Sequence, residues 1–177
     1  GIAAGQSTTD CIAVPNASAQ LEALLRSLQV ELGEALPEPL LLVGFSKGGV
    51  VLAALLRECS EALWARVESV HFVDAGLMVP GLFPTQDLSP LVRARSNLVI
   101  WLHGTPRQLS DASRPFIPEE MEAFAERCRA IGLRVEQRLY AAGSAPSLEM
   151  HFDSLRCFYT SPDDPDGGDG ACGYFAA

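Results

Sequence analysis

The chain has 177 residues, 48% of them hydrophobic and 20% charged, with a formal net charge of -9. This length suits one domain, and the apolar content excludes a chain that is disordered throughout. No apolar run approaches the roughly 18–20 residues of a membrane span, and no basic stripe is available to bind nucleic-acid phosphate. The composition therefore predicts an acidic globular domain that neither binds nucleic acid nor spans a membrane.

Helical and strand patterns alternate in the first half. Leucines at helical spacing predict a helix that ends at Gly33, with Asn16 or Ser18 as its N-cap. Residues 40–44 form a short continuous apolar run, which is typical of a strand buried on both faces. Residues 47–63 are rich in Ala, Leu and Val and predict a buried helix.

The alternation continues in the second half. Strands are predicted at 67–73, 97–103 and 133–140, and a helix from Pro118 to Gly132 separates the last two. A short C-terminal helix is expected around and after residue 151. Strands that alternate with helices imply right-handed crossovers. The sequence therefore predicts an α/β fold of about four parallel strands with helices on both faces.

The cysteines and the C-terminal segment carry no binding signal. The five cysteines are scattered, without a C-x-x-C pair, which disfavours both a disulfide framework and a zinc site. We expect reduced thiols in an intracellular compartment, no metal and no cofactor. Residues 160–170 contain four Asp and no basic residue. Residues 161–177 are therefore expected to form a disordered acidic tail, following a domain over residues 1–160.

One motif indicates chemistry. Gly44-Phe45-Ser46-Lys47-Gly48 matches G-x-S-x-G between a predicted strand and a predicted helix. In this context a sharp turn exposes the serine hydroxyl at the carboxyl edge of the sheet. Ser46 is then the candidate nucleophile, and the backbone N–H of Lys47 is a candidate oxyanion donor. Phe45 is a candidate pocket residue beside it.

A serine nucleophile needs a base and an orienting acid. His151 follows the last strand and is the candidate base, since a loop can return it over Ser46. The hydrolase-fold order Ser…Asp/Glu…His then favours Asp111 as the acid. Asp74, which ends the strand after Ser46, is the alternative acid. His103, at a strand exit, is either a hydrogen-bonded structural residue or part of a pocket wall.

Several sequence blocks resemble one known family. The segment Leu41–Leu52 is similar to the nucleophile segment of a mitochondrial, α/β-hydrolase-like family named for chromosome 2 open reading frame sixty-nine. Three more blocks resemble it in the same order, at residues 72–76, 103–117 and 145–152. The resemblance implies a serine-hydrolase-like fold and a mitochondrial address, and it supplies no substrate. The loop at 76–88 departs from the family pattern.

The position of Ser46 bounds the fold further. A full α/β-hydrolase sheet has several strands before the nucleophile, and one loop among them gives a second oxyanion N–H. Only 45 residues precede Ser46 here. We therefore expect the C-terminal portion of such a fold, lacking the N-terminal strands and the second oxyanion loop. The missing N-terminal half is then a partner of this chain, and the chain alone should show low solubility and little hydrolysis.

Three functions are compatible with the sequence. The first is a serine hydrolase that acts, when full length, on an ester, thioester or lipid-like acyl substrate. The second is a non-catalytic hydrolase-fold protein with an interaction or regulatory role. The third is an acyltransferase that uses the same triad. The acidic balance gives no electrostatic steering for anionic substrates, which favours neutral ones.

Overall fold

The computed structural model of the chain describes residues 14–58, 60–159 and 175–176. The elements in chain order are α1 (Ala17–Leu32), β1 (Leu40–Phe45), η2 (Ser46–Gly48), α2 (Gly49–Glu58), α3 (Glu61–Trp64), β2 (Val67–Val73), α4 (Ser89–Ala94), β3 (Val99–Gly104), α5 (Pro106–Leu109), α6 (Phe116–Ala130), β4 (Arg134–Leu139), α7 (Leu148–Tyr159) and β5 (Phe175–Ala176).

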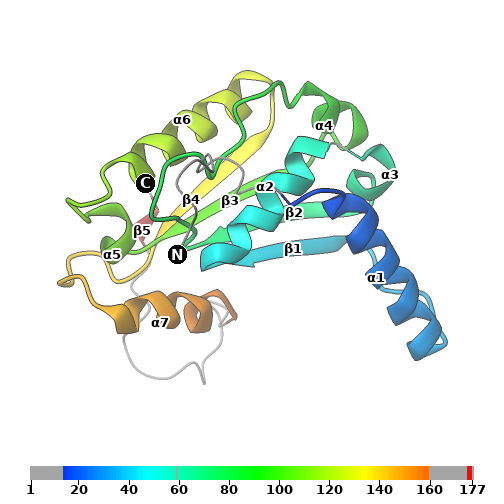
Figure 1. The fold of residues 1–177 in the computed structure, drawn as a ribbon, viewed down its shortest axis with the longest axis horizontal. Coiled ribbons are helices and arrows are strands. Elements are labelled where there is room, and N and C mark those ends of the chain that lie inside the picture. Colours follow the sequence, from blue (N-terminus) through cyan, green and yellow to red (C-terminus); the bar gives the residue numbers. More distant parts are fainter. Residues whose placement is uncertain (1–13, 59, 160–174, 177) are drawn as a thin grey trace, which may run out of the picture.

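The strands form one sheet in the order β1-β2-β3-β4-β5. The first three pairings are parallel, and the two-residue β5 pairs antiparallel with β4. The predicted α/β fold with four parallel strands is therefore confirmed, and β1 lies at the sheet edge (Figure 1). The predicted disordered tail lies outside the described residues, apart from Phe175–Ala176 of β5.

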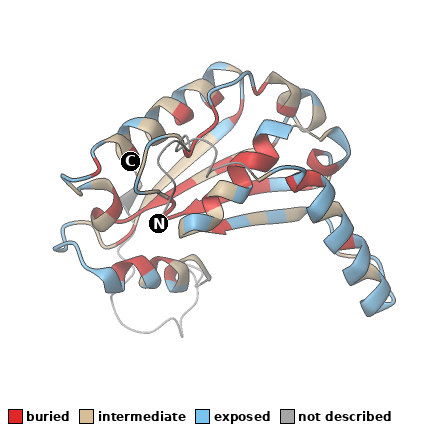
Figure 2. Ribbon diagram, viewed as in Figure 1, coloured by how far each residue is buried: buried red, intermediate tan, exposed pale blue. Residues whose placement is uncertain are grey.

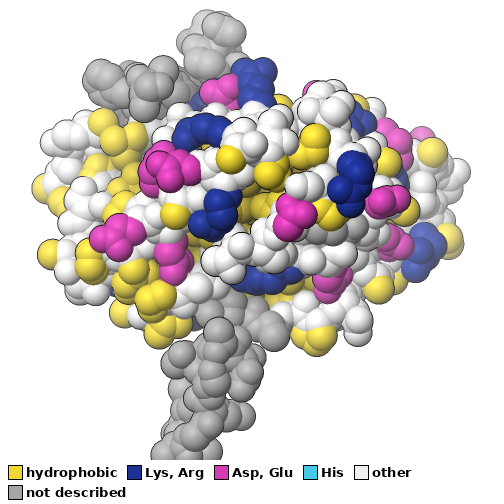
Figure 3. Space-filling view, turned by 90° about the horizontal axis from the view of Figure 1, so that it is seen from above, with side chains coloured by type: hydrophobic (Ala, Val, Ile, Leu, Met, Phe, Trp, Pro, Cys, Tyr) yellow, Lys and Arg dark blue, Asp and Glu magenta, His cyan; other side chains and the backbone are white. Residues whose placement is uncertain are grey.

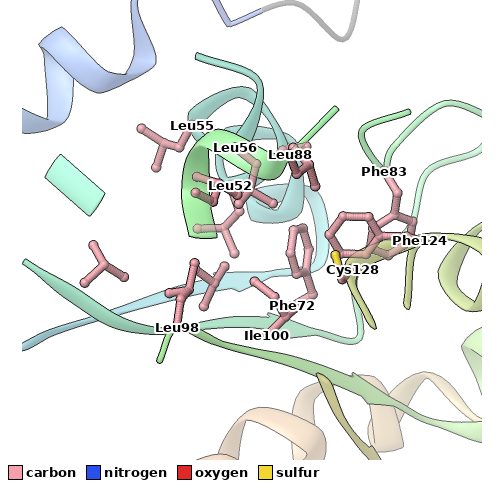
Figure 4. Packing of buried hydrophobic residues seen from close by; sticks show 14 of the residues in the cluster. Leu52, Leu55, Leu56, Phe72, Phe83, Leu88, Leu98, Ile100, Phe124 and Cys128 are labelled. Atoms are coloured by element: carbon pink, nitrogen blue, oxygen red, sulfur yellow. The ribbon is translucent and has the colours of Figure 1, made fainter. Parts of the chain in front are cut away.

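The hydrophobic core lies on one face of the sheet, beneath α2, α4 and α6. Helices α2, α4 and α6 lie on this side in Figure 1. Phe72 of β2 and Ile100 of β3 are almost fully buried here, and leucines of α2 pack against them (Figure 4). Phe124 and Cys128 of α6 complete the cluster, as its helical stripe predicts. Burial raises the pKa of the Cys128 thiol to about 12, so Cys128 is a neutral apolar core residue.

The second face of the sheet is covered by α7. Strand alternation brings Phe45, His71 and His103 to this face. The ring of Phe158 in α7 contacts both histidines edge-on, at centroid distances of 5.0 and 5.4 Å. Helices therefore lie on both faces, and the predicted layering is confirmed (Figure 1).

Strand β1 differs from the prediction of burial on both faces. Leu41 and Val43 are 56% and 38% exposed, and both project from the α7 side of the sheet. The apolar run predicted a strand correctly, but α7 covers β1 only near Phe45. Figure 2 shows the same contrast between the partly exposed β1 and the buried strand beside it.

Two local predictions are corrected. The helix predicted over residues 47–63 is divided into the 3₁₀ turn η2 and the helices α2 and α3. The scattered cysteines predict reduced thiols, but Cys157 of α7 is disulfide-bonded. Their spacing carries no signal for that bond, because disulfide pairing depends on tertiary proximity.

The charge distribution on the surface and the character of the helices bear on binding to other molecules and to membranes. On the part of the face visible in Figure 3, acidic and basic side chains are interspersed with apolar ones. Within the described ranges, no helix is both long and apolar enough to cross a membrane.

Candidate functional site

The site is built around the turn that joins β1 to η2. Phe45 is extended, and Ser46 then adopts a left-handed conformation with φ 53°. A non-glycine residue rarely adopts this conformation, and it is what a sharp strand-to-helix turn requires. A Cβ atom at Gly44 would lie 2.6 Å from Leu52 Cδ1 and 2.8 Å from the Gly48 carbonyl oxygen. Glycine at residue 44 therefore lets α2 pack closely against the strand end.

Asp74 occupies the equivalent position on the neighbouring strand. Phe45 pairs with Val73, so Ser46 and Asp74 both come directly after paired residues. Adjacent strands lie about 4.8 Å apart, which brings the two backbones close together. Asp74 also has a left-handed backbone, with φ 44°, and is 1% exposed.

The carboxylate of Asp74 is fully engaged by its surroundings. One oxygen, Oδ1, accepts hydrogen bonds from the backbone N–H and the hydroxyl of Thr105, each at 2.9 Å. The other oxygen, Oδ2, lies 2.5 Å from His151 Nδ1. The carboxylate thus joins the ends of β2 and β3 to α7.

His151 lies in the first turn of α7 and is nearly buried. Its ring packs against Phe45 at a centroid distance of 4.5 Å. Since Asp74 binds Nδ1, the opposite ring nitrogen Nε2 remains for a proton from another group. In the described part of the chain, no hydrogen bond joins the half-buried Ser46 hydroxyl to His151. Such bonds are often absent without substrate and form in the reacting complex.

The structure does not bring Asp111 to His151, which corrects the acid favoured by chain order. Asp111 Oδ1 accepts hydrogen bonds from the backbone and hydroxyl of Ser113, and Oδ2 accepts one from Arg114 at 2.8 Å. The Ser113 hydrogen bonds, followed by that from Arg114, lower the pKa of Asp111 to about 2. The chain leaves β3 through α5, so Asp111 begins a separate loop, and the alternative acid Asp74 binds the imidazole instead.

The remaining predicted site residues divide into two groups. Phe45 lies beside His151, and the exposed Lys47 follows Ser46 in η2, where its N–H is near the turn. His103 is 2% exposed, so it cannot line an open pocket. Of its two expected roles, the hydrogen-bonded structural role is the one observed.

A chain of buried polar groups crosses the α7 face. Ser69 Oγ lies 2.8 Å from His71 Nε2, and His71 Nδ1 lies 3.1 Å from His103 Nε2. His103 Nδ1 lies 2.8 Å from the Tyr140 hydroxyl. Burial, followed by the charge of Arg138, lowers the pKa of His71 to about 4. Burial, with the charges of His71 and Arg138, lowers the pKa of His103 to about 3.

Both rings in this chain are therefore neutral at pH 7, and each can donate at one nitrogen and accept at the other. Sequence reasoning missed Ser69, Tyr140 and Thr105. The alternation of Ser69 with His71 on one strand face was the available signal for the first of them. Within the described ranges, no group of three or more His, Cys, Asp or Glu side chains could hold a metal ion.

Comparisons with known proteins place the chain in a family. The family model described as C2orf69 matches residues 3–134, a range that includes Ser46, Asp74 and Asp111 and ends before His151. The chain is 32% identical over 122 residues to the mouse mitochondrial protein C2orf69 homolog, and 31% identical over 122 residues to the human mitochondrial protein C2orf69. These alignments cover 63% of this chain and 33% and 31% of the relatives.

A zebrafish mitochondrial protein C2orf69 homolog is 28% identical over 130 residues, covering 67% of this chain and 38% of the relative. The chain thus spans about one third of the length of the curated relatives that it matches. The family match covers most of the chain, including the turn at Ser46 and the buried Asp74. The chain belongs to the C2orf69 family.

Proposed function

We propose that the full-length protein is a serine hydrolase with Ser46 as nucleophile, His151 as base and Asp74 as the orienting acid. The hydrogen bond between Asp74 Oδ2 and His151 Nδ1, next to a serine on a left-handed turn, is the observation that carries this proposal. A buried carboxylate on one imidazole nitrogen fixes the tautomer and stabilises the ring when it is protonated.

The proposed hydrolysis has two steps, the acylation of Ser46 and the hydrolysis of the acyl group. Ser46 Oγ attacks the carbonyl carbon of an ester or thioester while His151 Nε2 takes the hydroxyl proton. The alcohol or thiol then leaves with that proton, and the acyl group stays on Ser46 as an ester. Water, activated by His151, hydrolyses this ester and restores the enzyme. The backbone N–H of Lys47 is the candidate donor to the negative oxygen formed in each step.

A fluorophosphonate probe tests the nucleophile. The probe should label the wild-type full-length protein, and Ser46→Ala should abolish the labelling. Labelling that survives Ser46→Ala would show that another residue is the nucleophile. Absence of labelling in the wild type would favour a non-catalytic interaction role for the fold.

A matched pair of aspartate variants tests the acid. Asp74→Asn should reduce the rate of labelling by on the order of 10³-fold or more, because the amide holds the imidazole in the wrong tautomer. Asp111→Asn should change the rate by less than about threefold, since Asp111 binds Ser113 and Arg114 instead of His151. Equal losses in the two variants would overturn the assignment of Asp74.

We also propose that the protein acts in mitochondria, because the three relatives are named mitochondrial proteins. Cell fractionation of the tagged full-length protein tests this location. Recovery outside the mitochondrial fraction would contradict it.

A further inference from the structure

An exposed apolar strip leads away from the candidate site. Phe45 packs against His151, and the ring of Phe152 lies 6.2 Å from that of Phe45 and 5.4 Å from that of His151. Phe152 is nonetheless 52% exposed. A large apolar ring that touches the base and also faces solvent can contact both the reacting centre and a bound molecule.

The strip continues in two directions from these rings. Leu148, 59% exposed, lies one helical turn before Phe152 on the same side of α7. Val43 and Leu41 precede Phe45 at alternate positions of β1 and therefore lie on the same sheet face. The strip thus consists of five apolar side chains, those of Leu41, Val43, Phe45, Leu148 and Phe152.

We propose that this strip binds the hydrocarbon chain of an acyl substrate, so that the enzyme prefers long-chain over short-chain acyl groups. The inference rests on the proposed serine hydrolase function. An alkyl chain is the expected ligand because the rings of Phe45 and Phe152 connect the strip directly to His151. The part of β1 between Leu41 and Phe45 is about 13 Å long at strand spacing, which suits an extended chain of many methylene groups.

Two phosphonofluoridates that differ only in their alkyl group, methyl or decyl, test the proposal on the full-length protein. In each reaction, Ser46 Oγ forms a bond to phosphorus, fluoride leaves and His151 takes the serine proton. Each methylene buried against the strip should raise the reaction rate by up to about fourfold. The decyl probe should therefore react at least about tenfold faster than the methyl probe.

Variants locate the preference on the strip. Phe152→Ala and Val43→Ser should each reduce the ratio of the decyl rate to the methyl rate by roughly three- to tenfold. Val30→Ala is the matched control, because Val30 is an exposed apolar residue of α1 outside the strip, and neither rate should change.

The outcomes separate this inference from the proposed function. Equal rates for the two probes, with labelling still dependent on Ser46, would overturn the acyl-chain inference alone. Failure of both probes to label Ser46 would overturn both proposals. If Phe152→Ala dissociated a dimer in sedimentation without changing the ratio of the two rates, the strip would be an interface between copies, and the inference would be wrong.

Discussion

Two non-glycine residues with left-handed backbones lie side by side at the carboxyl edge of the sheet. Ser46 and Asp74 follow paired residues of β1 and β2, with φ values of 53° and 44°. Such conformations cost energy and persist where the surrounding structure enforces them. At Asp74 this enforcement is visible, since Thr105 and His151 hold the carboxylate and the His103 carbonyl binds the backbone N–H.

The two glycines that flank Ser46 differ in how closely their surroundings approach them. Gly44→Ala should lower the free energy of unfolding by about 1–3 kcal/mol, because the new methyl group would overlap Leu52 and the Gly48 carbonyl oxygen. Gly48→Ala is the control, since no heavy atom lies within 4 Å of a Cβ built there. Urea denaturation of both variants measures the difference. Equal stabilities would show that the contact at Gly44 is not tight.

At the scale of elements, α7 connects the candidate site to the sheet. His151 and Phe158 are seven residues apart and so lie on the same side of the helix. The first binds Asp74, and the second packs on His71 and His103. Near the start of α7, Met150 sulfur accepts a hydrogen bond from the Arg107 backbone at 3.4 Å. Contacts along its length thus fix the position of the candidate base.

Helix α1 depends on another helix for its N-terminal cap. Asn16, although predicted as a cap, makes no side-chain capping bond. The carboxylate of Glu58 at the end of α2 instead accepts hydrogen bonds from the backbone N–H groups of Ala17 and Ser18, each at 2.7 Å. A carboxylate at a helix N-terminus satisfies free N–H groups and interacts favourably with the helix dipole.

Glu58→Ala should therefore lower the free energy of unfolding by about 1–2 kcal/mol. Glu31→Ala in the exposed part of α1 should change it by less than about 0.5 kcal/mol. Denaturant titration checks both values. A loss at Glu31 as large as that at Glu58 would contradict the capping role.

At the scale of the whole molecule, we expect the two faces of the sheet to contribute differently to stability in acid. The α2 and α6 face is apolar, whereas the α7 face contains His71 and His103 in a buried hydrogen-bonded chain. Each imidazole has a folded-state pKa below its usual value near 6.5. The unfolded chain therefore binds more protons than the folded chain below about pH 6.5, and stability falls as the pH falls towards the folded pKa values.

Each of these histidines should reduce the free energy of unfolding by up to about 1.4 kcal/mol per pH unit between about pH 6 and pH 4. His71→Gln removes one titrating group and should make this slope shallower by about that amount. Val70→Ala on the opposite face is the control, and it should lower stability equally at every pH. Equilibrium unfolding at several pH values measures the slopes. An unchanged slope in His71→Gln would exclude the histidine as its source.

The alternation of strands and helices and the turn at Ser46 can be predicted from the sequence. Both depend on short-range patterns: an apolar run, a helical period and two glycines beside one serine. The sequence also identifies Asp74 and Asp111 as the two acids to consider. Membership of the C2orf69 family is confirmed by the match over residues 3–134, which contains three of the four blocks that carry the resemblance. The α/β-hydrolase-like fold and the hydrolase activity stay proposals.

Which of the two acids binds His151 depends on tertiary packing. Chain order favoured Asp111, but strand register brings Asp74 beside Ser46, and the loop before α7 returns His151 to Asp74. The exposure of Leu41 and Val43 was equally beyond the sequence, because an apolar strand looks the same whether or not a helix covers it. The physical reason is common to both cases. Residue patterns set the local backbone, whereas partners across the sheet depend on how distant segments pack.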